Sequence, residues 1–263
     1  MKPVPPRLPL RTTLAEALSL WPAMAVGAGG VLALTAILWG AASWAGGLGW
    51  AVTVVSLLVW LVAWSAVTRI GVAGGVEAAR ATGLGPQGFQ IGRPELRLFG
   101  AVLLLSLFFA IILSLLGLTA LALFGAAGLN VEALKARDWA GVGPMWKLIL
   151  LALIGVALIA APLALMVRVS LFAQATIARG RMTSLGATAM TNGSMWPLFA
   201  GLVMIAAPGL VWLVVAVAAP MSAVWALIGW GVIQAGWQAP LTAGFLGAAW
   251  RRLERNDEEL APL

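Results

Sequence analysis

The side chains able to do acid–base, nucleophilic or metal chemistry are few in this 263-residue chain. It has nine Asp and Glu and sixteen Lys and Arg residues, but no His, no Cys and no Tyr. These absences exclude Ser-His triads, thiol nucleophiles, disulfides, and metal sites built from His or Cys. We therefore expect no catalytic residue, no metal site and no cofactor.

Two carboxylates, Glu77 and Glu95, bracket an arginine-rich segment that also holds Arg80, Arg93 and Arg97. A pair of carboxylates could act as a general acid and a general base. A solvated or interfacial salt-bridge cluster is the simpler interpretation, because each acid has basic neighbours. None of the nine acids lies within a long apolar stretch, which argues against the proton relay of a pump.

Five arginines lie where the chain would meet lipid headgroups. Arg168, Arg179 and Arg181 have no acidic neighbour in their segment, and Arg251 and Arg252 directly follow an apolar stretch. Each basic residue near an anionic leaflet contributes about 1 kcal/mol to surface binding. The five arginines predict a lipid-headgroup site; the alternative is that the positive-inside bias of membrane proteins accounts for them.

Gln234 and Gln238 lie four residues apart in an apolar stretch, so they share one face of a helix. Gly231 and Ala235 are close by in the sequence. Hydrogen bonding between helices across a seam of small residues would explain both glutamines. The alternative is that they line a path for a solute.

The segment Gly83-Leu84-Gly85-Pro86-Gln87-Gly88 matches the spacing of a dinucleotide-binding glycine motif. That motif requires a strand before it and a helix directly after it. Here an apolar helix precedes the glycines and Pro86 interrupts them, so a flexible loop is the better interpretation. In a later loop, Asn192-Gly193 is interpreted as a turn that ends a loop helix beginning near Thr183-Ser184.

The elements that position these residues are membrane helices. Hydrophobic residues make up 62% of the chain and charged residues 10%, against roughly 45–50% and about 25% in soluble domains. A bilayer core about 30 Å thick requires roughly 20 apolar residues in a helix. Six stretches without an internal charge approach or exceed this length: residues 24–44, 51–68, 98–125, 148–167, 197–218 and 222–250. The predicted fold is all-α, a polytopic membrane protein of six transmembrane helices with short interfacial helices in the N-terminus and the cytoplasmic loops.

We expect three regions along the chain: a cytoplasmic N-terminus over residues 1–22, a single transmembrane domain over residues 23–250, and a charged cytoplasmic tail over residues 251–263. The first residues lack the apolar segment of a cleaved signal peptide. Thr13 and Glu16 fit a capping box, which predicts a short interfacial helix over residues 13–21. An irregular tail is the alternative.

Lys and Arg are divided unevenly between the two sides of this topology. Thirteen of the sixteen fall on the side that holds both termini, and only Lys135, Arg137 and Lys147 fall on the other. The positive-inside rule therefore places both termini in the cytoplasm. Several tryptophans lie near predicted span ends, as interfacial anchors do: Trp21, Trp44, Trp50, Trp139, Trp146, Trp196 and Trp250. A pI near 11.5 does not indicate nucleic acid, because the charge is spread thinly along the membrane surface.

Two cytoplasmic segments repeat one arrangement. Arg69 is followed eleven residues later by Arg80, and Arg168 is followed at the same interval by Arg179. Each pair precedes a similar span start, Leu98-Phe99-Gly100 and Leu198-Phe199-Ala200. A duplicated helix–loop–helix unit would produce this pattern. The alternative is that basic loop ends recur in membrane proteins generally.

Motifs within residues 69–205 carry a resemblance to a family. They are Arg168-Val169-Ser170-Leu171-Phe172-Ala173, Ala178-Arg179-Gly180-Arg181, Met190-Thr191-Asn192-Gly193-Ser194-Met195-Trp196 and Gly92-Arg93-Pro94-Glu95-Leu96-Arg97. The chain resembles uncharacterised six-span inner-membrane proteins of proteobacteria, which are distantly similar to the membrane domain attached to some glycerophosphoryl diester phosphodiesterases. It departs from their pattern at Ala187-Thr188 and at Asn192. No phosphodiesterase domain is expected, so the resemblance implies architecture and a bacterial inner-membrane location, not hydrolysis.

These observations predict a non-enzymatic integral membrane protein that acts as an accessory or interaction subunit, or as a lipid-associated scaffold. Its partners would be membrane lipids, including anionic headgroups at the cytoplasmic face, and other membrane protein subunits, with no nucleic acid. The alternative is a transporter or flippase-like carrier of a lipidic or weakly polar solute beside Gln234 and Gln238. A lipid-modifying enzyme is the remaining alternative, and no acid–base pair in the chain has a suitable setting for it.

Overall fold

The computed structural model describes residues 8–42, 44, 46–128, 130–136, 138–183, 188, 191, 193–219 and 221–260. Every regular element in these residues is a helix, as the all-α prediction requires. Contacts divide the chain into two compact units. The first comprises residues 1–102 and 168–263, and the second comprises residues 103–167.

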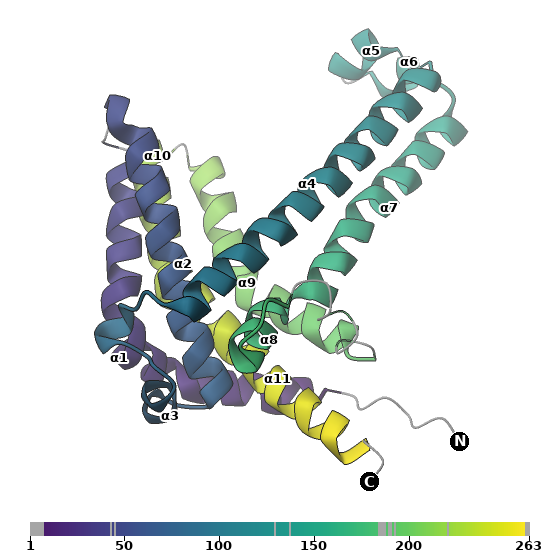
Figure 1. Cartoon of the computed structure of the whole chain (residues 1–263). Helices are drawn as coiled ribbons and strands as arrows, with labels where there is room; N and C mark the ends of the chain where they lie inside the picture. Colours follow the sequence, from purple (N-terminus) through teal and green to yellow (C-terminus); the bar gives the residue numbers. More distant parts are fainter. Residues whose placement is uncertain are drawn as a thin grey trace. The chain divides into compact units, whose positions relative to one another are not determined.

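The first unit contains most of the helices. In chain order they are α1 (Leu10–Ala42), η1 (Gly46–Leu48), α2 (Gly49–Ala73), α3 (Val76–Ala81), η2 (Pro86–Gly88), the start of α4 (Arg93–Ala126), α8 (Phe172–Arg179), α9 (Met195–Ala218), α10 (Ala223–Ile233), η4 (Gln234–Gln238) and α11 (Ala239–Leu260). The most extensive contacts join α1, α2 and α11. Figure 1 shows α11, in yellow, crossing near the ends of α1 and α2.

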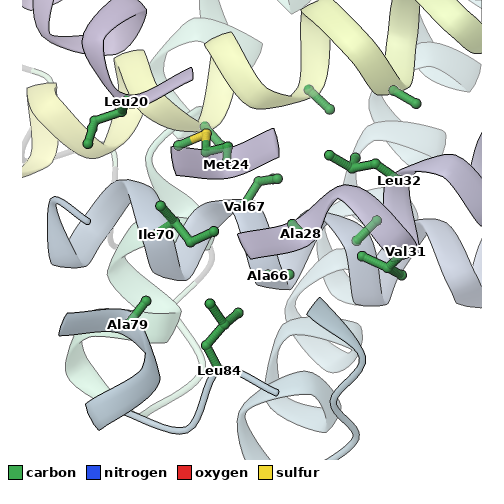
Figure 2. Packing of buried hydrophobic residues seen from close by; sticks show 14 residues of the cluster. Leu20, Met24, Ala28, Val31, Leu32, Ala66, Val67, Ile70, Ala79 and Leu84 are labelled. Atoms are coloured by element: carbon green, nitrogen blue, oxygen red, sulfur yellow. The ribbon is translucent and has the colours of Figure 1, made fainter. Parts of the chain in front are cut away.

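The core of this unit is a cluster of mostly small apolar side chains between α1 and α2. Figure 2 shows Met24 of α1 above Val67 and Ile70 of α2, with Leu84 reaching toward them from the loop after α3. Ala28, Ala66 and other alanines of the cluster let the helix backbones approach closely. Close approach through small residues is how helices associate where lipid removes the hydrophobic driving force.

The second unit contains the rest of α4, the short helices α5 (Val131–Lys135) and α6 (Trp139–Val142), and α7 (Met145–Val169) as far as Val167. Figure 1 shows α4 and α7 as two arms joined at one end by α5 and α6. Only 6% of the most apolar window of each arm is buried by protein. Apolar surface of this extent is rare on soluble proteins, so these arms are suited to lipid or to a membrane partner.

Five helical segments are long and apolar enough to cross a membrane: Leu10–Ala42, Gly49–Ala73, Pro86–Leu123, Met145–Arg179 and Met195–Ala218. They overlap the first five predicted spans, of which the first and the third extend two residues beyond their segments. The sixth, residues 222–250, corresponds to α10, η4 and α11, which follow one another without a non-helical residue. α10 has only 11 residues and α11 ends in charged residues, so neither of them meets the length and hydropathy of a span alone.

The predicted interfacial helix over residues 13–21 is the first part of α1 and not a separate element. α1 contains Pro22, and Figure 1 shows its first turns running crosswise to the rest of the helix. Proline removes one helical hydrogen bond and commonly kinks a helix, which accounts for this bend. The predicted capping box is wrong, because α1 begins at Leu10 and the Thr13 hydroxyl donates to the Pro9 carbonyl at 2.8 Å.

The two segments predicted to repeat share an order of elements. α2 is followed by the short helix α3, which has Arg80 in its last turn, and α7 is followed by the short helix α8, which has Arg179 in its last turn. Leu98 and Leu198, near the starts of the next long helices, are both fully buried. The first arginines differ, since Arg69 is buried and Arg168 is exposed. The two segments therefore share the order of their helices but differ in how their first arginine packs. Duplication of a helix–loop–helix unit stays a hypothesis.

Candidate functional site

A buried ion pair lies where α2 meets the start of α4. Arg69, near the end of α2, donates from Nη2 to Glu95 Oε1 at 2.6 Å, and the two side chains are 6% and 7% exposed. The Ser65 hydroxyl donates to the same carboxylate oxygen at 2.8 Å. Arg69 Nη1 donates to the Thr82 carbonyl, also at 2.8 Å. Arg69 therefore connects α2 to Thr82, directly after α3, and to Glu95, in the first turn of α4.

This geometry corrects the prediction for Glu95, which was expected in a solvated or interfacial cluster with Arg80, Arg93 and Arg97. Its carboxylate is buried and its partner is Arg69, which lies one helical turn after Ser65 on α2. Ser65 and Arg69 are spaced so that both side chains reach one point. That spacing was a signal in the sequence, but nothing local indicates that Glu95 folds back onto α2.

A second charged group lies where α1, α2 and α11 cross. Arg251 of α11 donates to the Gly71 carbonyl of α2 and to a carboxylate oxygen of Glu16 on α1. Arg252 donates to the other Glu16 oxygen at 3.1 Å. Arg251 thus satisfies a carbonyl in the last turn of α2, where helical partners are missing, and joins three helices through one guanidinium.

Two glycines make this crossing possible. A Cβ added to Gly71 would lie 2.4 Å from the Ala243 carbonyl oxygen, and a Cβ added to Gly247 would lie 2.3 Å from the Gly71 carbonyl carbon. The backbones of α2 and α11 are therefore in direct contact. Because Arg251 follows Gly247 by one turn, this contact brings its guanidinium to the end of α2.

A pocket of about 290 Å³ lies between these two charged groups. It is lined by the end of α2, the middle of α11, α8, the residue after α3 and the first turn of α4: Arg69, Val72, Ala73, Thr82, Pro94, Ile177, Ala178, Trp250, Arg251 and Glu254. We call it the α2–α11 pocket. Its lining includes two arginines and one glutamate beside apolar residues, so charged residues of both signs border it.

The wall of this pocket includes Trp250, which is only 1% exposed. The guanidinium of Arg179, at the end of α8, lies over its ring, 5.1 Å from the centroid. A cation over an indole face is favourable, more so when water is excluded. Trp250 therefore packs inside the protein, although its place at a predicted span end indicated an interfacial anchor.

The five predicted headgroup arginines are placed in different settings. Arg251 and Arg252 both donate hydrogen bonds to Glu16. Arg179 stacks on Trp250, the residue that precedes Arg251 in α11. Arg168 and Arg181 are exposed, and neither lines the α2–α11 pocket. The residues that sequence reasoning missed at this site are Arg69, Thr82, Glu16 and Glu254.

Gln234 and Gln238 lie in η4, a turn of π-helix. Gln234 Nε2 donates to Gln238 Oε1 at 2.8 Å, within the same helical segment. Gln238 also approaches α9, since a Cβ added to Gly209 would lie 3.0 Å from its Oε1. On the same segment, Gly231 packs near α1 and Ala235 belongs to the buried core, in keeping with a small-residue seam.

An apolar pocket of about 290 Å³ lies between α1 and the π-helical turn. Trp21, Gly29, Gly236 and Pro240 contribute to its lining. The Trp21 indole N–H donates to the Gly236 carbonyl at 2.9 Å. Neither glutamine is part of this lining, so the pocket and the Gln234–Gln238 pair lie on different parts of η4.

The segment over residues 83–88, predicted to be a loop, packs against α1 and α2. A Cβ on Gly88 would lie 2.8 Å from a Val31 methyl group and 3.1 Å from Ala66. Gln87 adopts a positive φ of 54° and accepts a hydrogen bond from the Gly30 amide at 3.2 Å. The glycines therefore allow the loop to approach α1 and α2, and the segment has no strand-to-helix geometry for a nucleotide.

Several buried polar atoms around α2 and α8 have no hydrogen-bond partner within the described part of the chain. They include Thr68 Oγ1, Arg69 Nε and both amide atoms of Gln174, whose side chain is fully buried. Buried polar groups are nearly always paired with protein or water. Among the described residues, no group of three or more His, Cys, Asp or Glu side chains is arranged to hold a metal ion.

The predicted loop-helix start at Ser184 and the turn at Asn192 lie outside the described residues. No protein-family model matches this chain, and no curated protein or solved structure matches it either.

Proposed function

We propose that this chain is a six-span protein of the bacterial inner membrane, with both termini in the cytoplasm, that acts without enzymatic activity as an accessory subunit or a lipid-associated scaffold. The observation that carries the proposal is the exposure of the α4 and α7 arms, where 6% of the most apolar window is buried. Such arms require lipid or partner helices around them.

The sixth span would be the continuous helix formed by α10, η4 and the first part of α11. Residues 223–250 are helical and carry no charged side chain. Their length exceeds the roughly 20 residues that a bilayer requires. A six-span topology keeps the 13-to-3 division of basic residues between the two sides. The resemblance to six-span proteobacterial proteins supports the same architecture.

Two carboxylates with resolved partners support a structural role over an acid–base role. Glu95 is held by Arg69 and Ser65, and Glu16 is held by Arg251 and Arg252. Both carboxylates already accept hydrogen bonds from guanidinium groups, an arrangement typical of a structural ion pair and not of a free general acid or base.

A transporter or flippase-like carrier is the second candidate, and the π-helical turn favours it. Such turns are rare and often mark functional positions, and η4 carries the Gln234–Gln238 pair within an otherwise apolar helix. A weakly polar solute could exchange hydrogen bonds with this pair.

Reconstituted vesicles would separate these two functions. The purified protein would be placed in liposomes with a fluorescent phospholipid analogue, and transfer between leaflets would be measured for the wild type and for a Gln234→Leu/Gln238→Leu double variant. A scaffold gives no transfer above protein-free vesicles in either case. Transfer by the wild type that the double variant loses, with folding retained, would overturn the scaffold proposal.

The accessory role is tested by photo-crosslinking from the arms in native membranes. A photoreactive residue at Leu118 of α4 or Leu153 of α7, both exposed, is expected to form adducts with lipid or with a discrete membrane protein. The same residue at buried Met24 of α1 is the control and should form neither. Equal adduct yields from all three sites would contradict the proposed role of the arms.

A further inference from the structure

The α2–α11 pocket has the size and charge of a site for a small zwitterionic group. Its volume of about 290 Å³ is at the lower end for ligand pockets, which run from roughly 300 to 1,000 Å³. A headgroup fits such a volume, whereas a whole lipid does not. Because Arg69, Arg251 and Glu254 line it together, it presents donors for an anion and an acceptor for a cation.

Both arginines are held in place before any ligand arrives. Arg69 is fixed by Glu95 and the Thr82 carbonyl, and Arg251 is fixed by Glu16 and the Gly71 carbonyl. A guanidinium has five N–H donors, so each keeps donors beyond these contacts. Rigid guanidinium groups suit phosphate, which they recognise through parallel hydrogen bonds.

Glu254 distinguishes this pocket from a simple anion site. It lines the pocket one turn after Arg251 on α11 and is half-buried. A carboxylate beside the arginines would repel a dianion but would pair with an ammonium group a few ångströms from the phosphate. The combination matches a phosphoethanolamine group, which carries both charges.

The place of the pocket in the fold points to a lipid as the source of that group. It lies at the end of α2 and where α11 emerges from its apolar part at Trp250, on the side that the basic residues assign to the cytoplasm. Headgroups of the inner leaflet lie at this depth. This step rests on the proposed topology.

We propose that the α2–α11 pocket binds the headgroup of a phospholipid of the phosphatidylethanolamine type, with Arg69 and Arg251 toward its phosphate and Glu254 toward its ammonium group. Ala178 and Ile177 of α8 form the wall against which the rest of the headgroup packs. The lipid would bridge α2, α8 and α11 and so stabilise the cytoplasmic end of the first unit.

The test compares lipid selectivity in the full chain. The protein in detergent is titrated with phosphatidylethanolamine or with phosphatidylglycerol, and bound lipid is counted by native mass spectrometry. Glu254→Gln should weaken binding of phosphatidylethanolamine about fivefold, because the variant loses one partly exposed ion pair with the ammonium group. Binding of phosphatidylglycerol, which has no ammonium group, should not fall. The matched control is Glu77→Gln, which alters an exposed carboxylate outside the pocket and should change neither.

A second variant addresses the pocket without altering its charges. Ala178 is exposed at the rim, so Ala178→Trp should fill the pocket while the helices keep their packing, and binding of phosphatidylethanolamine should fall. Soluble phosphoethanolamine and inorganic phosphate serve as competitors. Unchanged selectivity in Glu254→Gln, unchanged binding in Ala178→Trp, or full displacement by either soluble competitor would each overturn the proposal.

The same samples separate this proposal from the proposed function. Membrane integration is measured by carbonate extraction, and leaflet transfer is measured as above. A wild-type protein that binds both lipids equally, stays in the membrane and transfers no lipid removes the pocket proposal and leaves the scaffold in place. Release of the wild type by carbonate would instead contradict the membrane topology.

Discussion

The indole N–H of Trp21 donates to the backbone carbonyl of Gly236, at 2.9 Å, and this bond joins the bend of α1 to the π-helical turn. Gly236 lies four residues before Pro240, which has no N–H to donate to that carbonyl. A tryptophan 215 residues away in the sequence supplies the missing donor. Trp21 is therefore a structural hydrogen-bond donor as well as a residue near the start of a predicted span.

Trp21→Phe keeps an aromatic ring and removes this donor. We expect a loss of about 0.5–1.5 kcal/mol in the free energy of unfolding, the net contribution of one hydrogen bond, because Trp21 and Gly236 are both exposed in the protein. Thermal unfolding in detergent measures it, and Trp50→Phe at an exposed site is the control. In a Pro240→Ala background the loss should shrink, since the backbone can then supply the donor. An equal loss in both backgrounds would contradict the pairing.

Arg69→Met should destabilise the first unit by about 3–5 kcal/mol, because it leaves the buried Glu95 carboxylate without its guanidinium. The double variant Arg69→Met/Glu95→Leu should cost less than Arg69→Met alone, since no unpaired charge remains. Unfolding by denaturant in mixed micelles measures both. If the double variant is the less stable of the two, the pair is not the cause of the effect.

Gly247→Ala should separate α2 from α11, because its Cβ would meet the Gly71 backbone at 2.3 Å. Forcing extra volume into a packed contact typically costs about 1–3 kcal/mol. Gly117→Ala in α4 is the matched control, since a Cβ there meets nothing within 4 Å. The control should be neutral or slightly stabilising, because alanine favours helix over glycine. The melting temperatures of Gly247→Ala and Gly117→Ala measure the two effects. Equal shifts in melting temperature would contradict the close contact between α2 and α11.

The membrane orientation can be measured by labelling single introduced cysteines, because the chain has no cysteine of its own. Arg255→Cys lies on the predicted cytoplasmic side, and Met145→Cys lies on the opposite side, both at exposed positions. A membrane-impermeant thiol reagent added to intact cells with a permeable outer membrane should label the cysteine at position 145 and spare the one at position 255. Labelling at position 255 before lysis would reverse the assigned topology.

Local sequence signals predicted the elements well where hydropathy alone decides them. The gap between the predicted spans 24–44 and 51–68 marked the break between α1 and α2, and the apolar stretches marked the long helices. They predicted the charged site poorly. Glu95 was expected near solvent and is buried against Arg69, and no local signal indicated that Arg251 and Arg252 both bond to Glu16.

By itself the sequence determined the membrane class, the positions of the apolar stretches and the uneven distribution of basic residues. These properties depend on composition and on neighbours along the chain. Only the tertiary structure decided which charges meet, because Glu16 and Arg251 are 235 residues apart and their contact requires α11 to cross α1 and α2. That crossing depends on close backbone contact at Gly71 and Gly247, a fit between distant surfaces that no local pattern encodes.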